Sequence, residues 1–131
     1  MKKYLWLLAF GFSVSAHAYS ANELQNDCQA ADDFYTRHTD PEPSLKATRC
    51  ISYVMGVADG YAVSDFLAEK VGVKLNAFCL PKESDLTRRL VRATLAQLEH
   101  TAPNSATSTA MLVAGGFART FPCTDSLEPK K

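Results

Sequence analysis

The stretch LKATRCISYVMGVADGYAVSDFL, residues 45–67, decides the fold of this 131-residue chain. Its apolar and small residues recur three or four positions apart, as they do on one face of an α-helix. Ser44 precedes the stretch and is a suitable N-cap for a helix. We therefore expect a helix over about residues 45–67 whose core face is formed by Ala47, Ile51, Val54, Ala58 and Ala62.

The opposite face of this helix is also nearly apolar, which is unusual for a helix at a protein surface. It carries Tyr53, Gly56, Gly60, Val63 and Leu67. A helix that is apolar nearly all round is buried nearly all round, so this face either packs inside the bundle or contacts a second copy of the chain. Glycines four residues apart let another backbone approach closely. The sequence leaves both alternatives open, and a homodimer interface is expected to consist of Tyr53, Gly56, Gly60 and Val63.

One helix is expected before this stretch, and a loop is expected after it. Ser20 and Glu23 form a capping box, from which a helix runs to about Arg37. Residues 69–81 contain a glycine and a hint of alternating apolar residues, but they have no helical period. We expect a long loop there, with a short strand as the alternative.

Two further helices are expected in the C-terminal half of the chain. The first spans about residues 82–100 and is opened by Pro81, and the second spans about residues 105–120 and ends before Pro122. Because only about four residues join them, these two helices should pack antiparallel as a hairpin.

In this arrangement the four cysteines can form two disulfides. The hairpin brings Cys79, just before the third helix, beside Cys123, just after the fourth. Cys28 lies on the inward face of the first helix and Cys50 near the start of the second, so a disulfide can join these helices too. Among the three pairings that four cysteines allow, we expect Cys28–Cys50 and Cys79–Cys123. The expected fold class is all-α, a small four-helix bundle-like domain stapled by two disulfides.

The N-terminal residues 1–18 have the organisation of a secretory signal peptide. Lys2 and Lys3 precede an apolar run, and Ala16-His17-Ala18 follows it as a cleavage site. The run is shorter than the roughly 20 apolar residues that a membrane anchor needs. We expect residues 1–18 to be removed on export and residues 19–131 to form a single helical domain with no membrane contact. An exported protein also meets the oxidising conditions in which disulfides form.

Composition and motifs nominate no catalytic residue, metal site or cofactor. The chain has 14 basic and 14 acidic residues, without the basic cluster that marks a nucleic-acid partner. The cysteines lack the C-x₂₋₄-C spacing of zinc sites. Neither the C-x-x-C-H haem motif nor the G-x-S-x-G nucleophile motif is present in the sequence. We therefore expect a binding or structural protein and not an enzyme.

Three motifs, in this order, resemble those of a known family. They are CISYVMGVADGY at residues 50–61, FCLP at 78–81 and FARTFPC at 117–123. Over about residues 24–123 the chain is similar to the Rap/Tai family of type VI secretion immunity proteins. The resemblance implies a small, exported, helical protein of the Gram-negative periplasm, homodimeric in several relatives. It also implies binding to a secreted toxin, typically a peptidoglycan amidase, whose active site is occluded.

Contacts with one particular toxin are expected on exposed loops. The segment from Ser64 to Asn76 is the candidate, because a loop of this length in a small domain is uncommon unless it is functional. A simple connector is the alternative. The candidate partner-binding residues are the polar Asp65, Glu69, Lys70 and Lys74 and the apolar Val71 and Leu75.

Two other classes of function compete with immunity. A small periplasmic stress chaperone would also be helical, disulfide-bonded and dimeric. Its pH trigger would need His or carboxylate clusters at the interface, where the central helix offers only Asp59. A carrier of lipids or small ligands would need a large cavity, of which the many alanines give no sign. The immunity hypothesis therefore ranks first.

Overall fold

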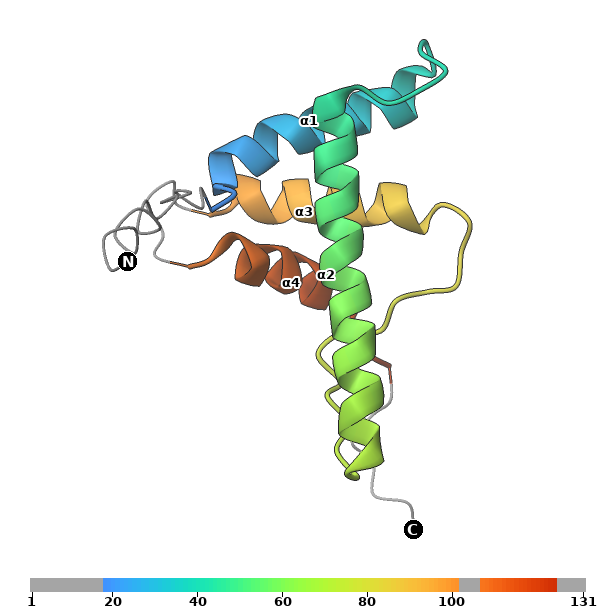
Figure 1. Ribbon diagram of the computed structural model, residues 1–131, viewed down its shortest axis with the longest axis vertical. Helices are drawn as coiled ribbons and strands as arrows, with labels where there is room; N and C mark the ends of the chain where they lie inside the picture. The colour runs from blue at the N-terminus through green and yellow to red at the C-terminus, as the bar shows by residue number, and fades with distance from the viewer. Residues whose placement is uncertain (1–17, 102–106, 125–131) are drawn as a thin grey trace, which may run out of the picture.

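The computed structural model describes residues 18–101 and 107–124. In these ranges the chain forms four α-helices and no strand: α1 (Ala21–Arg37), α2 (Leu45–Lys70), α3 (Leu86–Glu99) and α4 (Thr109–Thr120). Figure 1 shows α2 lying across the other three helices and extending beyond them at its C-terminal end. The expected all-α fold of packed helices is confirmed. The signal peptide expected over residues 1–18 lies, except for Ala18, outside the described residues.

The starts of α1 and α2 are set by local sequence signals. The Ser20 side chain accepts a hydrogen bond from the Glu23 N–H, and the Glu23 carboxylate accepts one from the Ser20 N–H, which completes the expected capping box. Ser44 caps α2 by accepting from the Ala47 N–H at 3.2 Å. The predicted starts are therefore right, while α2 ends three residues later than residue 67, at Lys70.

The starts predicted for the last two helices are wrong. α3 begins at Leu86, because Pro81 belongs to a segment that is tied to the end of α4 through Cys79. The residues between Pro81 and Leu86 then connect this segment to the first turn of α3. α4 begins at Thr109, where the Ser108 side chain accepts from the Met111 N–H. The part of the expected turn and helix at 102–106 lies outside the described residues.

The core lies between α1, α3, α4 and the N-terminal half of α2. The buried residues of α2 are Ala47, Cys50, Val54 and Ala58, so the helix buries no side chain after Ala58. Ala62, expected on the core face, is exposed. The largest contributions from the other helices are Leu24 and Cys28 in α1, Leu90 and Val91 in α3, and Leu112, Val113 and Phe117 in α4.

The antiparallel hairpin of α3 and α4 is present, as expected (Figure 1). The two helices approach closely at Gly116, where an added Cβ would lie 2.8 Å from the Ala93 carbonyl oxygen. Only a residue without a side chain fits that contact. Gly116 therefore sets the distance between the two helices.

The two disulfides have the expected pairing, Cys28–Cys50 and Cys79–Cys123. Their surroundings differ. Cys28 and Cys50 are fully buried in the core, whereas Cys79 is exposed and Cys123 is half-buried. Beside the second disulfide, the Cys79 N–H donates to the Phe121 carbonyl at 2.8 Å, and Phe78 packs edge-to-face on Phe117. This second disulfide fixes the end of the segment that follows α2.

Candidate binding surface

The glycine face of α2 is open to solvent in the single chain. A Cβ added at Gly56 or at Gly60 would meet no atom within 4 Å. On the same face Tyr53 is half-buried and Val63 is 58% exposed. Of the two alternatives left by the sequence, packing inside this chain's own bundle is therefore excluded for Gly56, Gly60 and Val63. Tyr53, in contrast, packs against the core.

The C-terminal end of α2 and the segment after it expose a cluster of apolar side chains, here called the apolar tip. Exposed large apolar side chains that lie close together in the chain make this region a candidate interaction site. Figure 1 shows this end of α2 projecting from the bundle, with the following segment returning alongside it. The tip consists of Val63, Phe66, Leu67, Val71, Val73 and Leu75, which are between 40% and 78% exposed.

The segment after α2 is held against the helix by side chains of α2 itself. The Leu75 N–H donates to the Asp65 carboxylate at 3.2 Å, and the Ala77 N–H donates to the Tyr61 hydroxyl oxygen at 2.8 Å. The Tyr61 ring also stacks on Phe78, with ring centroids 3.9 Å apart. The long loop is therefore an ordered strap, which we call the 71–80 strap.

Most of the residues predicted to bind a partner gather at the tip. Glu69, Lys70 and Lys74 are exposed around it, and the Lys70 ammonium lies 4.7 Å from the centre of the Phe66 ring. Asp65 is different, because it is half-buried and its carboxylate holds the strap.

Sequence reasoning missed Phe66 and Val73 as members of the same surface. No periodic signal identifies them, because their exposure depends on where α2 leaves the bundle.

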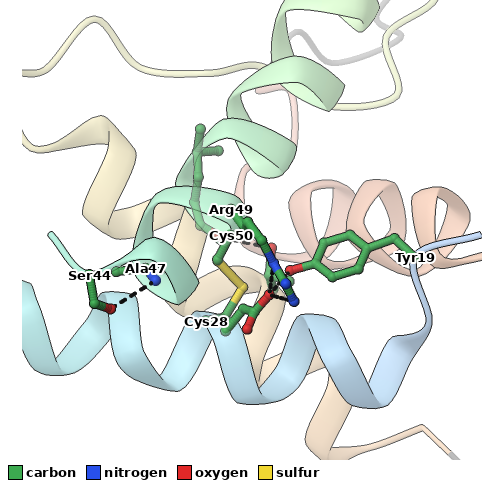
Figure 2. The surroundings of a disulfide bond; sticks show 9 residues. Tyr19, Cys28, Ser44, Ala47, Arg49 and Cys50 are labelled. Carbon is green, nitrogen blue, oxygen red and sulfur yellow. Dashed lines mark hydrogen bonds and ion pairs between the residues drawn. A yellow bond between two sulfur atoms is a disulfide. The ribbon is translucent and has the colours of Figure 1, made fainter.

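A polar cluster missed by the sequence analysis lies at the other end of α2. The Asp27 carboxylate is 2% exposed, and Arg49 contacts one of its oxygens through Nε at 2.8 Å and Nη2 at 2.6 Å. The Tyr19 hydroxyl donates to the same oxygen (Figure 2). Burial, followed by the hydrogen bond to Asp27, raises the pKa of Tyr19. The Asp27 contact likewise raises the pKa of Arg49.

A shallow, mainly apolar pocket of about 450 Å³ opens beside this cluster. It is lined by Tyr19, Thr48, Arg49, Ser52 and Tyr53. The Tyr19 ring meets the Tyr53 ring edge-to-face, with centroids 5.0 Å apart, so the two rings form one wall together. The pocket therefore adjoins the N-terminal half of the glycine face.

The described ranges contain neither a metal-site grouping nor a membrane span. No three His, Cys, Asp or Glu side chains in residues 18–101 and 107–124 are grouped so as to hold a metal ion. No helix in that part of the chain is both long and apolar enough to cross a bilayer.

Comparison with known proteins identifies the family. No curated protein and no solved structure matches the chain. The model of the Rap1a immunity proteins matches residues 20–123, which is most of the sequence and includes all four helices and both disulfides. The chain therefore belongs to the Rap1a immunity protein family, whose members neutralise toxins and are not enzymes.

Proposed function

We propose that this protein binds a toxin delivered by a type VI secretion system and occludes its active site. The toxin is a peptidoglycan amidase, the class that the sequence resemblance implies. The observation that supports occlusion is the apolar tip. Enzyme active sites are concave, and a narrow helix end with its strap is a convex shape that can enter one.

The chemistry of the tip fits the usual anatomy of a protein interface. The tip exposes apolar side chains such as Phe66 and Leu75, and Glu69, Lys70 and Lys74, their neighbours in the chain, are exposed as well. Interfaces of this kind bury an apolar centre and keep a polar rim in water. Because Asp65 and Tyr61 already order the strap, little conformational entropy is lost on binding.

Place of action is the second part of the proposal. Residues 1–18 direct export, and the mature protein from Tyr19 onward works in the periplasm, where an amidase would meet peptidoglycan. Two disulfides and no free cysteine among the described residues agree with an oxidising compartment.

Self-association is the third part. We propose that the mature protein is a homodimer and that its interface includes Tyr53, Gly56, Gly60 and Val63. Glycine costs about 1 kcal/mol relative to alanine inside a helix. The chain's own packing does not need glycine at residue 56 or 60, since both have open space in front of them. A second backbone is what such positions accommodate.

The decisive experiment is protection against the toxin. Cells that express a periplasmic amidase toxin should survive when this protein is co-exported and should lyse when residues 1–18 are deleted. Leu75→Asp and the double change Lys70→Glu with Lys74→Glu should weaken binding to the toxin at least about tenfold, because interfaces concentrate energy in few residues.

Melting temperature and a matched control separate binding from folding. Met111 on α4 is 65% exposed and distant from the tip in sequence, so Met111→Asp should leave both binding and melting temperature unchanged. Full protection by all tip variants would place the toxin contact elsewhere. Failure to bind any peptidoglycan-directed toxin, together with suppression of acid-induced aggregation of other proteins, would favour the chaperone class.

A further inference from the structure

One stripe of α2 carries a regular series of outward-facing residues. The residues along this stripe are three or four positions apart, which is the spacing that keeps a seam facing a second helix. The stripe consists of Leu45, Arg49, Tyr53, Gly56, Gly60, Val63, Leu67 and the C-cap Val71. It is on the outside of the bundle, since each of these residues is exposed or half-exposed.

The stripe is symmetric about its midpoint. Leu45 and Val71 are equally far in sequence from Ala58, and they are the two most exposed large apolar residues of the described chain, at 77% and 78%. The same relation joins Tyr53 with Val63 and Gly56 with Gly60. Such a pattern makes a surface complementary to a second, antiparallel copy of itself.

The two halves of the stripe also differ in shape in a complementary way. The C-terminal half presents Val63 and Leu67, each 58% exposed. The N-terminal half presents the 450 Å³ pocket lined in part by Tyr53 and Arg49. Between them lie the two glycines with open space. An apolar ridge and an apolar pocket therefore lie on opposite sides of a point where two backbones can touch.

We propose that two copies of the chain pair antiparallel along this stripe, about a two-fold axis at the glycines, so that Val63 and Leu67 of each copy enter the pocket of the other. The inference rests on the homodimer part of the proposed function and adds its geometry. In a two-fold interface each contact occurs twice, so Leu45 of one copy meets Val71 of the other.

The charge of Arg49 does not oppose this pairing. Its guanidinium is already engaged by the Asp27 carboxylate, which leaves the aliphatic stem to be covered by Leu67 of the second copy. Arginine stems commonly pack against apolar surface in this way. The pairing assigns Val71 to the dimer and leaves Phe66, Val73 and Leu75 for the toxin.

Cysteine cross-linking of the mature protein tests the direction of pairing. Tyr53→Cys and Val63→Cys variants, one of them tagged, are mixed and oxidised with diamide; the native cysteines in the described residues are all paired. An antiparallel pair brings residue 53 of one copy to residue 63 of the other and keeps the two residues 63 about 15 Å apart along the axis. The expected product is therefore the mixed dimer, with little cross-linking of Val63→Cys to itself.

The outcomes separate the inference from the proposals on which it rests. Efficient cross-linking of Val63→Cys to itself would overturn the antiparallel arrangement and leave the homodimer proposal standing. A monomer in light scattering at all concentrations would overturn both, while toxin protection would still be judged by its own assay.

Leu67 and Phe66 provide a matched pair of variants. They are neighbours on α2 with nearly equal exposure, 58% and 56%, but only Leu67 is on the stripe. Leu67→Asp should weaken dimerisation at least tenfold and Phe66→Asp by less than twofold, with helical circular dichroism unchanged in both. Equal effects of the two variants, or no effect of Leu67→Asp, would overturn the proposal.

Discussion

Asp27 is a buried carboxylate whose charge is compensated from two other parts of the chain. Tyr19, before α1, and Arg49, in α2, both donate to one of its oxygens. Without such partners a carboxylate at this depth would cost several kcal/mol of folding free energy. The backbone of Tyr19 is held as well, because the Thr109 hydroxyl donates to its carbonyl at 2.6 Å. The cluster therefore ties the N-terminal segment to α1, α2 and α4.

Tyr19→Phe tests this cluster through its pH dependence. Losing a hydrogen bond to a buried charge should lower the free energy of unfolding by about 1–3 kcal/mol near pH 7. The folded state raises the pKa of Tyr19 above its ordinary value of 10.0, so this stabilisation is complete below pH 10 and is lost as pH rises towards the folded pKa. Urea titrations should show that the difference in free energy of unfolding between wild type and variant, the stability gap, narrows above pH 10. A gap that widens there would contradict the assignment.

The same substitution is expected to have opposite effects on stability at Gly116 and at its neighbour Gly115. A methyl group at Gly116 would overlap the Ala93 carbonyl at 2.8 Å, whereas one at Gly115 meets only the flexible Gln97 side chain at 3.6 Å. Gly116→Ala should destabilise the protein by about 1–3 kcal/mol through overpacking. Gly115→Ala should be neutral or stabilise it by up to about 1 kcal/mol through helix propensity. Thermal unfolding monitored by circular dichroism distinguishes the two.

At the scale of the elements, the two parts of α2 have different structural roles. Its N-terminal half packs in the core and is linked to α1 by the buried disulfide. After Ala58 the helix buries no residue and instead supports the 71–80 strap through Tyr61 and Asp65. The second half is therefore a platform whose stability comes from the helix itself and from the strap.

Asp65→Ala should release the strap without unfolding the bundle. The Leu75 amide loses its acceptor, so its hydrogen exchange should accelerate about tenfold or more, while the melting temperature changes little because the site is outside the core. Toxin affinity should fall because the strap is no longer ordered before binding. Asp65→Asn retains an acceptor oxygen, so it should restore most of the slow exchange at Leu75 and most of the toxin affinity. Unchanged exchange at Leu75 in the alanine variant would show that the contact does not hold the strap.

The sequence was sufficient for features that depend on local patterns and insufficient for those that depend on distant contacts. The caps at Ser20 and Ser44 and both cysteine pairings were predictable. The start of α3 was not, since Cys79 holds the preceding segment at the end of α4. The Asp27 cluster was not predictable either, because its members share no motif and meet only when α1 and α2 pack.

At the scale of the whole molecule, the two disulfides hold different regions. Cys28–Cys50 is within the core, and Cys79–Cys123 joins the strap to the end of the helical hairpin. Chain-entropy arithmetic gives about 3.4 and 4.0 kcal/mol for the two loops that they close. Both values are large beside the roughly 5–15 kcal/mol of a typical domain.

Reduction of the native protein should proceed in a fixed order. Dithiothreitol reaches Cys79, which is exposed, before it reaches Cys28 or Cys50, which are fully buried. Alkylation followed by peptide mass analysis should detect free Cys79 and Cys123 first, with the helical signal still present. Cys79→Ala should lower both melting temperature and toxin protection. Simultaneous reduction of both pairs would mean that the protein opens globally before either disulfide is attacked.

The placement of the apolar tip outside the core also bears on how such a protein changes over generations. Residues such as Phe66, Val73 and Leu75 are exposed and contribute little to the core, so most substitutions there cost little folding free energy. If the tip contacts the toxin as proposed, mutations that adjust the match to an altered toxin can therefore accumulate without first requiring compensating mutations in the bundle. On that proposal, one set of residues preserves the fold and another set changes the specificity.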